Sequence, residues 1–217
     1  IFNTIPTANG ALADLVLGQA NFTTYTSNRG GTVAANTLST PYGAYTDGTR
    51  LYVADYSNHR VMVWTTFPTA NGQAADFVLG QANFTTGTAN RGGTVAANTL
   101  SNPRGVMEAG GKLIVAEYGN FRALVWNSIP NATGTAADVA IGQASLTAAT
   151  AAATATGMGR PFNMNYNNGR LWITDATNNR ILGYNGIPTS NGATADWIIG
   201  QNGNTNALVN RYGVSGV

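Results

Sequence analysis

Four residues with chemically active side chains lie together between two apolar runs: Asp55, Asn58, His59 and Arg60, within LYVADYSNHRVMVW at 51–64. Carboxylate, imidazole and guanidinium groups serve general acid–base catalysis and the binding of developing charge. The same residue types also suit a tight turn, because Asp or Asn accepts hydrogen bonds from nearby backbone N–H groups and Arg can pair with the carboxylate. The first interpretation predicts an enzyme, and the second predicts a structural motif.

Two further copies of this stretch favour the structural interpretation. They read LIVAEYGNFRALVW at 113–126 and LWITDATNNRILGY at 171–184. The positions equivalent to His59 hold Phe121 and Asn179, whereas an acid, an Asn and an Arg recur in every copy. We therefore predict a repeated structural turn motif made of Asp55, Asn58, Arg60, Glu117, Asn120, Arg122, Asp175, Asn178 and Arg180.

The remaining acids offer little material for catalysis. Four of the nine acidic residues are Asp in a second repeated segment and three belong to the turn motif, which leaves Asp47 and Glu108. General acid–base pairs need carboxylates in unequal environments, and repetition argues against that. One His and no Cys cannot build a three-His or thiolate zinc site. The sequence thus predicts no catalytic residue, no cofactor and no metal, and hence a protein that is not an enzyme.

The second repeated segment has the same spacing as the turn motif. IPTANGALADLVLGQANFTT at 5–24 returns at 67–86, at 129–148 and, shortened, at 187–201. Its prolines, Pro6, Pro68, Pro130 and Pro188, are 62, 62 and 58 residues apart. A fixed period of tens of residues is typical of solenoids and propellers.

Each repeat contains four short apolar runs bounded by Gly, Pro, Asn or Thr, which favours strands over helices. In the first complete repeat they are 41–46, 50–55, 60–64 and 76–81. Four-stranded antiparallel sheets repeated at a fixed period indicate an all-β propeller. We expect a single propeller arc over 1–217, with complete blades at about 41–81, 103–143 and 161–201 and partial blades at 1–22 and 207–217.

The LYVADYSNHRVMVW unit resembles the NHL repeat, in which an apolar strand, an Asp, a short turn with Asn and Arg, and a second apolar strand follow one another. The segment AADFVLGQANF at 74–84 is similar to the outer strand of bacterial secreted NHL-repeat proteins. The resemblance covers nearly the whole chain. It implies a β-propeller and an extracellular or cell-surface location, but no activity, since this fold hosts many functions.

The long connections between repeats are the better functional candidates. Two nearly identical segments of about twenty residues follow Gln19 and Gln81, and loops of that length often serve binding. Their similarity also fits regular packing over the propeller. The residues that could contact a partner there are Phe22, Tyr25, Arg29, Phe84 and Arg91.

Composition narrows the choice of partner. The net charge is +2 and eleven basic residues are spread along the chain, so nucleic acid is not expected. No apolar run reaches the length of a membrane span. We expect a non-catalytic interaction or structural module that binds a protein partner or itself. A carbohydrate-binding propeller with repeated loop sites and a fragment of a propeller enzyme whose catalytic residues lie elsewhere are the alternatives.

Overall fold

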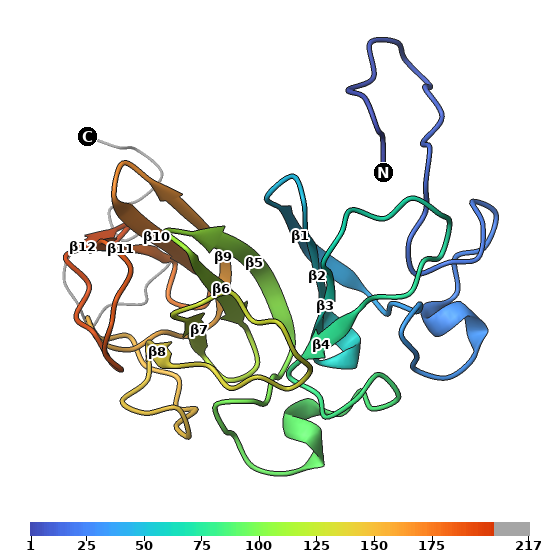
Figure 1. Ribbon diagram of the computed structural model, residues 1–217. Coiled ribbons are helices and arrows are strands. Elements are labelled where there is room, and N and C mark those ends of the chain that lie inside the picture. The colour runs from blue at the N-terminus through green and yellow to red at the C-terminus, as the bar shows by residue number, and fades with distance from the viewer. Residues whose placement is uncertain (202–217) are drawn as a thin grey trace.

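The computed structural model describes residues 1–201, which contain three four-stranded antiparallel sheets (Figure 1). In each sheet the strands follow one another in chain order. The first sheet contains β1 (Pro41–Thr46), β2 (Leu51–Asp55), β3 (Arg60–Trp64) and β4 (Phe77–Leu79). The second contains β5 (Pro103–Ala109), β6 (Lys112–Glu117), β7 (Arg122–Trp126) and β8 (Val139–Ile141). The third contains β9 (Pro161–Asn167), β10 (Arg170–Asp175), β11 (Arg180–Asn185) and β12 (Trp197–Ile199).

The central strands are apolar on both sides because both faces of the first two sheets are covered. Every residue of β2, β3 and β7 is buried. Antiparallel pairing places Leu51 opposite Trp64 and Val53 opposite Met62. Alternate residues of one strand therefore enter two different hydrophobic layers, one on each side of the sheet.

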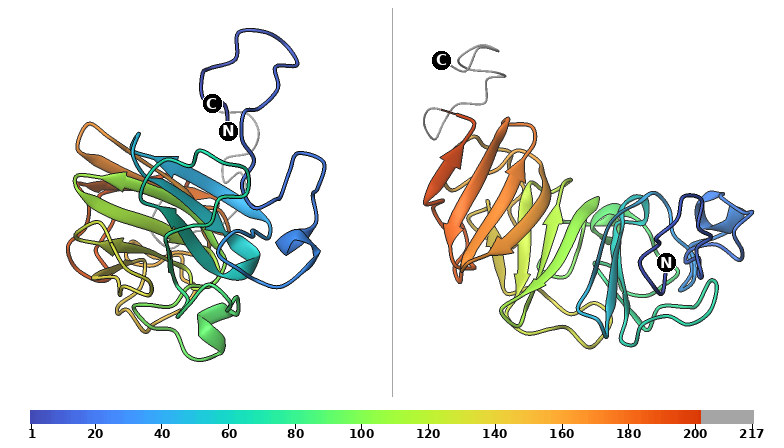
Figure 2. Two further views of the ribbon diagram at one scale, coloured as in Figure 1. Left: turned by 45° about the vertical axis from the view of Figure 1, so that its right-hand side comes forward. Right: turned by 90° about the horizontal axis from the view of Figure 1, so that it is seen from above.

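Neighbouring sheets stack face to face, as the blades of a propeller do (Figure 2). The layer between the first and second sheets includes Tyr52 and Val61 from one side and Val115 and Trp126 from the other. An equivalent layer joins the second and third sheets. The prediction of an all-β fold built from four-stranded propeller blades is confirmed. Over residues 1–201 the blades form an open arc rather than a closed ring (Figure 2).

The inner strands β1, β5 and β9 converge, and two glycines permit their close approach. A Cβ added to Gly43 on β1 would lie 2.4 Å from the carbonyl oxygen of Arg104 on β5. A Cβ added to Gly105 on β5 would lie 3.2 Å from the carbonyl oxygen of Phe162 on β9. Only a residue without a side chain allows such contact between two backbones. This contact fixes which side chains meet near the axis of the arc.

The segment before the first sheet follows the course of a blade without forming a strand. The N–H groups of Asp14 and Leu15 donate to the carbonyl of Ile1, at 2.9 and 3.2 Å. The N–H of Asp76 bonds to Val63 in the same way one repeat later. Residues 1–40 contain one short 3-10 helix, η1 (Ser27–Gly30), and no strand. The predicted partial blade at 207–217 lies outside the described residues.

Two other short 3-10 helices occupy connections: η2 (Tyr56–Asn58) joins β2 to β3, and η3 (Ala89–Gly92) precedes the second sheet. Among residues 1–201, no helix is long and apolar enough to cross a membrane.

Candidate functional site

The turn motif of the first blade forms a buried network at the junction of β2 and β3. Oδ2 of Asp55 accepts hydrogen bonds from Arg60 Nε and Asn58 Nδ2, both at 2.8 Å. Its Oδ1 accepts the backbone N–H of Ser39 at 2.7 Å. The motif can close because His59, the residue after η2, adopts the left-handed conformation, φ 51°, which turns the chain back into β3. We call the three motif residues of a blade its clamp.

Arg60 joins its own blade to the loops on either side. Its Nη2 donates to the carbonyls of Ala34 and Thr37, at 3.0 and 2.8 Å, in the loop before the blade. Its Nη1 donates to the carbonyl of Phe84 at 2.7 Å, in the loop after the blade. One guanidinium therefore holds two loops that are about fifty residues apart in the sequence.

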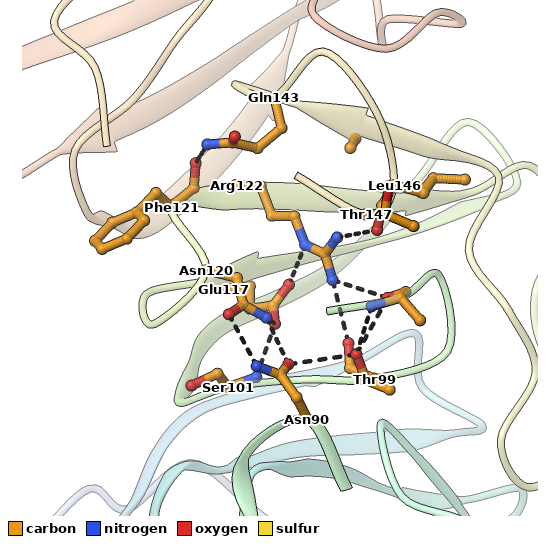
Figure 3. Close-up of polar contacts among 12 residues, drawn as sticks. Asn90, Thr99, Ser101, Glu117, Asn120, Phe121, Arg122, Gln143, Leu146 and Thr147 are labelled. Carbon is orange, nitrogen blue, oxygen red and sulfur yellow. Dashed lines mark hydrogen bonds and ion pairs between the residues drawn. The ribbon is translucent and has the colours of Figure 1, made fainter. Parts of the chain in front are cut away.

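The second and third blades repeat this arrangement, and Figure 3 draws it for the second. There Glu117 accepts the N–H of Ser101 at 2.7 Å and Arg122 Nε at 2.5 Å, and also bonds to Asn120. In the third blade Asp175 accepts Arg180 Nε at 2.9 Å and Asn178 Nδ2 at 2.8 Å. The structure thus brings together all nine predicted motif residues, three in each blade.

Burial governs the electrostatics of the clamps. The side chains of each acid–arginine pair are fully buried. Burial raises the pKa of the Asp55 and Glu117 carboxyls, and the guanidinium of Arg60 or Arg122 opposes that rise. Because the clamp acids are fully buried and already accept several hydrogen bonds, they are placed to support the blades rather than to meet a substrate.

His59 has a local role outside the clamp. Its Nδ1 accepts the backbone N–H of Asn102 at 3.1 Å, which ties the first blade to the start of β5. Burial lowers the pKa of the imidazole, and the carboxylate of Asp55 partly offsets this. The bond needs the unprotonated nitrogen, so the neutral form of His59 matches the structure.

The predicted interaction loops divide into anchored and exposed residues. Nη2 of Arg29 donates to the carbonyls of Gln19 and Gly72, and Nη2 of Arg91 donates to Gln81. Phe84 is half-buried against the core of the first blade. In contrast, Phe22 and Tyr25 are 54% and 89% exposed. Only these two aromatic residues of the predicted loop set are open to a partner.

A second cluster, which the sequence did not point to, lies where the inner strands converge. The guanidinium carbon of Arg104 on β5 lies 4.5 Å from the ring centroid of Tyr42 on β1 and 4.2 Å from that of Phe162 on β9. The rings of Tyr118 and Tyr56 flank it at 4.0 and 5.1 Å. We call Arg104, these four rings and Arg160 the axial arginine cluster.

Arg160 completes the cluster from the segment before β9. Its Nη1 donates to the hydroxyl of Tyr118 at 2.7 Å, and its guanidinium carbon lies 4.6 Å from the same ring. Tyr118 therefore stands between two guanidinium groups. Cations close to aromatic rings are stabilised by the negative ring face, which favours this arrangement.

A departure from the repeat could have revealed this cluster. Tyr42, Arg104 and Phe162 occupy one repeat position, directly after the proline that begins each inner strand. That position changes from Tyr to Arg to Phe, whereas the proline before it recurs in all three blades. In a repeat protein, a position that varies between copies is not needed for the structure that the copies share. Such a position can therefore serve a function.

The two acids outside the repeat do not form a catalytic pair. The hydroxyl of Tyr52 donates to Glu108, and burial raises the pKa of that tyrosine. Asp47 bonds to the backbone and guanidinium of Arg50 in an exposed turn. Among residues 1–201, no three His, Cys, Asp or Glu side chains lie close enough to hold a metal ion.

Comparison with known proteins relates this architecture to propellers. No protein-family model matches the sequence, and no curated protein matches it either. Among solved structures, the glutaminyl cyclase of Myxococcus xanthus aligns at 14% identity and a TM-score of 0.40, covering 70% of this chain and 53% of that one. A Bacteroides uniformis protein, provisionally assigned as a 6-phosphogluconolactonase, aligns at 14% identity and a TM-score of 0.41, covering 67% of this chain and 38% of that one. The virginiamycin B lyase of Staphylococcus aureus aligns at 16% identity and a TM-score of 0.30, covering 72% of this chain and 59% of that one.

These comparisons correct one expectation. The prediction that the chain is not an enzyme is wrong as an inference from the sequence, because the propeller-like structures to which it is similar are enzymes. The repetition of the clamp acids excludes catalysis only at the clamps, since function on a shared fold lies in sites added to it. At these identities the likeness concerns the fold alone. The chain spans 38–59% of the length of these structures.

Proposed function

We propose that this chain is an NHL-type propeller module that binds protein through the open face of its third blade. The supporting observation is the equivalence of that face to the faces buried between blades. Trp172 and Ile181 occupy the repeat positions of Tyr52 and Val61, which are fully buried against the second blade. On the third blade the same positions are only half-buried and border a shallow apolar hollow.

Further apolar side chains extend this face along the outer strand. Ile199 on β12 is 51% exposed, whereas its counterparts Leu79 and Ile141 are fully buried. Trp197 on the same strand stacks on Trp172, with ring centroids 5.6 Å apart. Exposed apolar surface of this kind is typical of an interaction site.

The partner that fits best is another blade, supplied by a second copy of the chain. The layer between the first and second blades already joins such a face to the opposite face of the next sheet. A contact of this kind between copies is heterologous, so it leads to a ring or a filament rather than to a two-fold dimer.

Analytical ultracentrifugation over a concentration series tests this proposal. We expect association of the unmodified chain and its loss in Ile181→Asp, which places a charge in the apolar layer. Ala132→Asp is the matched control, because Ala132 is exposed in the loop between β7 and β8 of the second blade. A chain that stays monomeric at every concentration, or an Ile181→Asp variant that associates as the control does, overturns the proposal.

Repeated carbohydrate sites receive less support. The most exposed aromatic residue of the predicted loops is Tyr25, and its counterpart in the next repeat is Gly87. Phe22 is exposed while its counterpart Phe84 is half-buried. One glycan site per blade would need the same side chains in each loop, so a single contact near Tyr25 is the most that this arrangement supports.

An extracellular or cell-surface location remains part of the proposal. It is supported by the low share of charged residues, 9%, and by the resemblance to bacterial secreted NHL repeats. Fractionation of the source cells, with detection of the chain by antibody, tests it.

A further inference from the structure

The axial arginine cluster contains a cation without a polar partner. Arg104 is half-buried, and its guanidinium forms no hydrogen bond or ion pair with the described residues. Its Nε is fully buried and lacks an acceptor. A guanidinium normally satisfies several of its five N–H groups, as the clamp arginines do. The aromatic rings contact the guanidinium of Arg104, but its N–H groups have no hydrogen-bond acceptor among the described residues.

The charges around the cluster do not balance it. The three clamp acids, Asp55, Glu117 and Asp175, are each paired with the arginine of their own clamp. Glu108, further along β5, is bonded to Tyr52. Arg160 forms no ion pair among the described residues, so the cluster has two uncompensated positive charges, both close to the ring of Tyr118.

The cluster is partly open to solvent at the end where the inner strands β1 and β9 begin. Tyr42 and Phe162 are 49% and 40% exposed, with their ring centroids 6.1 Å apart on the surface of the arc. Arg160 is exposed beside them. The two rings and two cations therefore border a surface that a small molecule can reach.

We propose that the axial arginine cluster binds an oxyanion, the carboxylate or phosphate group of a small ligand. The rings cover the faces of the Arg104 guanidinium, so the anion is bound along its Nη edge, where a planar fork suits two parallel N–H···O bonds. Arg160 supplies a second positive charge. The hydroxyl of Tyr118 accepts from Arg160 and can donate its own proton to the anion.

This site is separate from the clamps and from the apolar face of the third blade. It uses residues contributed by all three blades, so it exists only when the inner strands converge. The proposal does not rest on association between copies, because each chain contains every residue of the cluster.

Isothermal titration calorimetry on the full chain tests the site, at constant ionic strength set with sodium chloride. Inorganic phosphate and benzoate serve as probes for the two sources of an oxyanion. We expect saturable binding of at least one of them. Phosphate alone would indicate a phosphorylated ligand, and benzoate alone a carboxylic acid.

Substitutions then locate the binding. Arg104→Gln and Arg160→Gln should each weaken it by about tenfold or more, the effect of losing one hydrogen bond to a charged group. Arg50→Gln is the matched control, because Arg50 lies in the turn between β1 and β2 and pairs with Asp47. Circular dichroism checks folding, and Arg160→Gln, at an exposed position, decides the matter if Arg104→Gln does not fold. The proposal is overturned if neither anion binds saturably, or if a folded variant of either cluster arginine binds as tightly as the control.

Discussion

Nε of Arg60 donates to Oδ2 of Asp55 at 2.8 Å, and neither side chain is exposed to solvent. The same guanidinium donates to three backbone carbonyls in two loops. The pair is therefore a junction between blade and loops, and its energetic weight comes from the number of groups that would lose a partner together.

Removing this junction should destabilise the whole arc. Arg60→Ala leaves a buried carboxylate without its counter-ion and removes a donor from three carbonyls. The loss of one member of a buried pair costs about 3–5 kcal/mol. Urea unfolding followed by circular dichroism measures it. Arg50→Ala, at the exposed pair with Asp47, should change the free energy of unfolding by less than about 1 kcal/mol. Equal effects of the two substitutions would contradict the role assigned to the clamp.

The convergence of the inner strands predicts a second effect. Gly43→Ala places a methyl group where the carbonyl oxygen of Arg104 lies 2.4 Å away, so β1 and β5 must separate. Overpacking of this kind costs about 1–3 kcal/mol. Gly31→Ala is the control, since its nearest atom lies at 3.7 Å and its φ is −123°. Thermal melting distinguishes the two, and an unchanged melting temperature for Gly43→Ala would mean that the strands tolerate separation.

His59 predicts a dependence of stability on pH. Burial lowers its pKa below the ordinary 6.5 in the folded chain, so the folded state binds fewer protons than the unfolded state. The contribution is therefore complete above about pH 6.5 and is lost as the pH falls through the lowered pKa.

A substitution taken from the third repeat isolates this effect. His59→Asn introduces the residue found at Asn179, which adopts the same left-handed backbone at φ 52°. Melting curves between pH 7 and 5 should show a smaller decline for His59→Asn than for the unmodified chain. Parallel declines would assign the pH dependence to other groups.

The strands and clamps were predictable because they rest on local and repeated constraints. Short apolar runs, turn-forming Asn and Gly, and the recurring Arg five residues after the acid and two after the Asn all act within one blade. The expected strand at 60–64 is β3, and the strand expected at 76–81 appears as β4, Phe77–Leu79. Comparison of the copies also separated His59 from the clamp. Its position holds His, Phe and Asn in turn, whereas the acid, the Asn and the Arg of the clamp recur in every copy.

The axial arginine cluster was not predictable from the same pattern. Tyr42, Arg104 and Phe162 hold one position of the repeat, but the period alone does not say how closely the inner strands of successive blades approach. By itself the sequence determined the blades, their clamps and the repeat that relates them, because those features need only contacts within a blade or between loop and blade. The tertiary structure decided which residues face one another across blades. The backbone contacts of Gly43 and Gly105 bring the rings of Tyr42 and Phe162 to the guanidinium of Arg104, which holds the same repeat position on the strand between them.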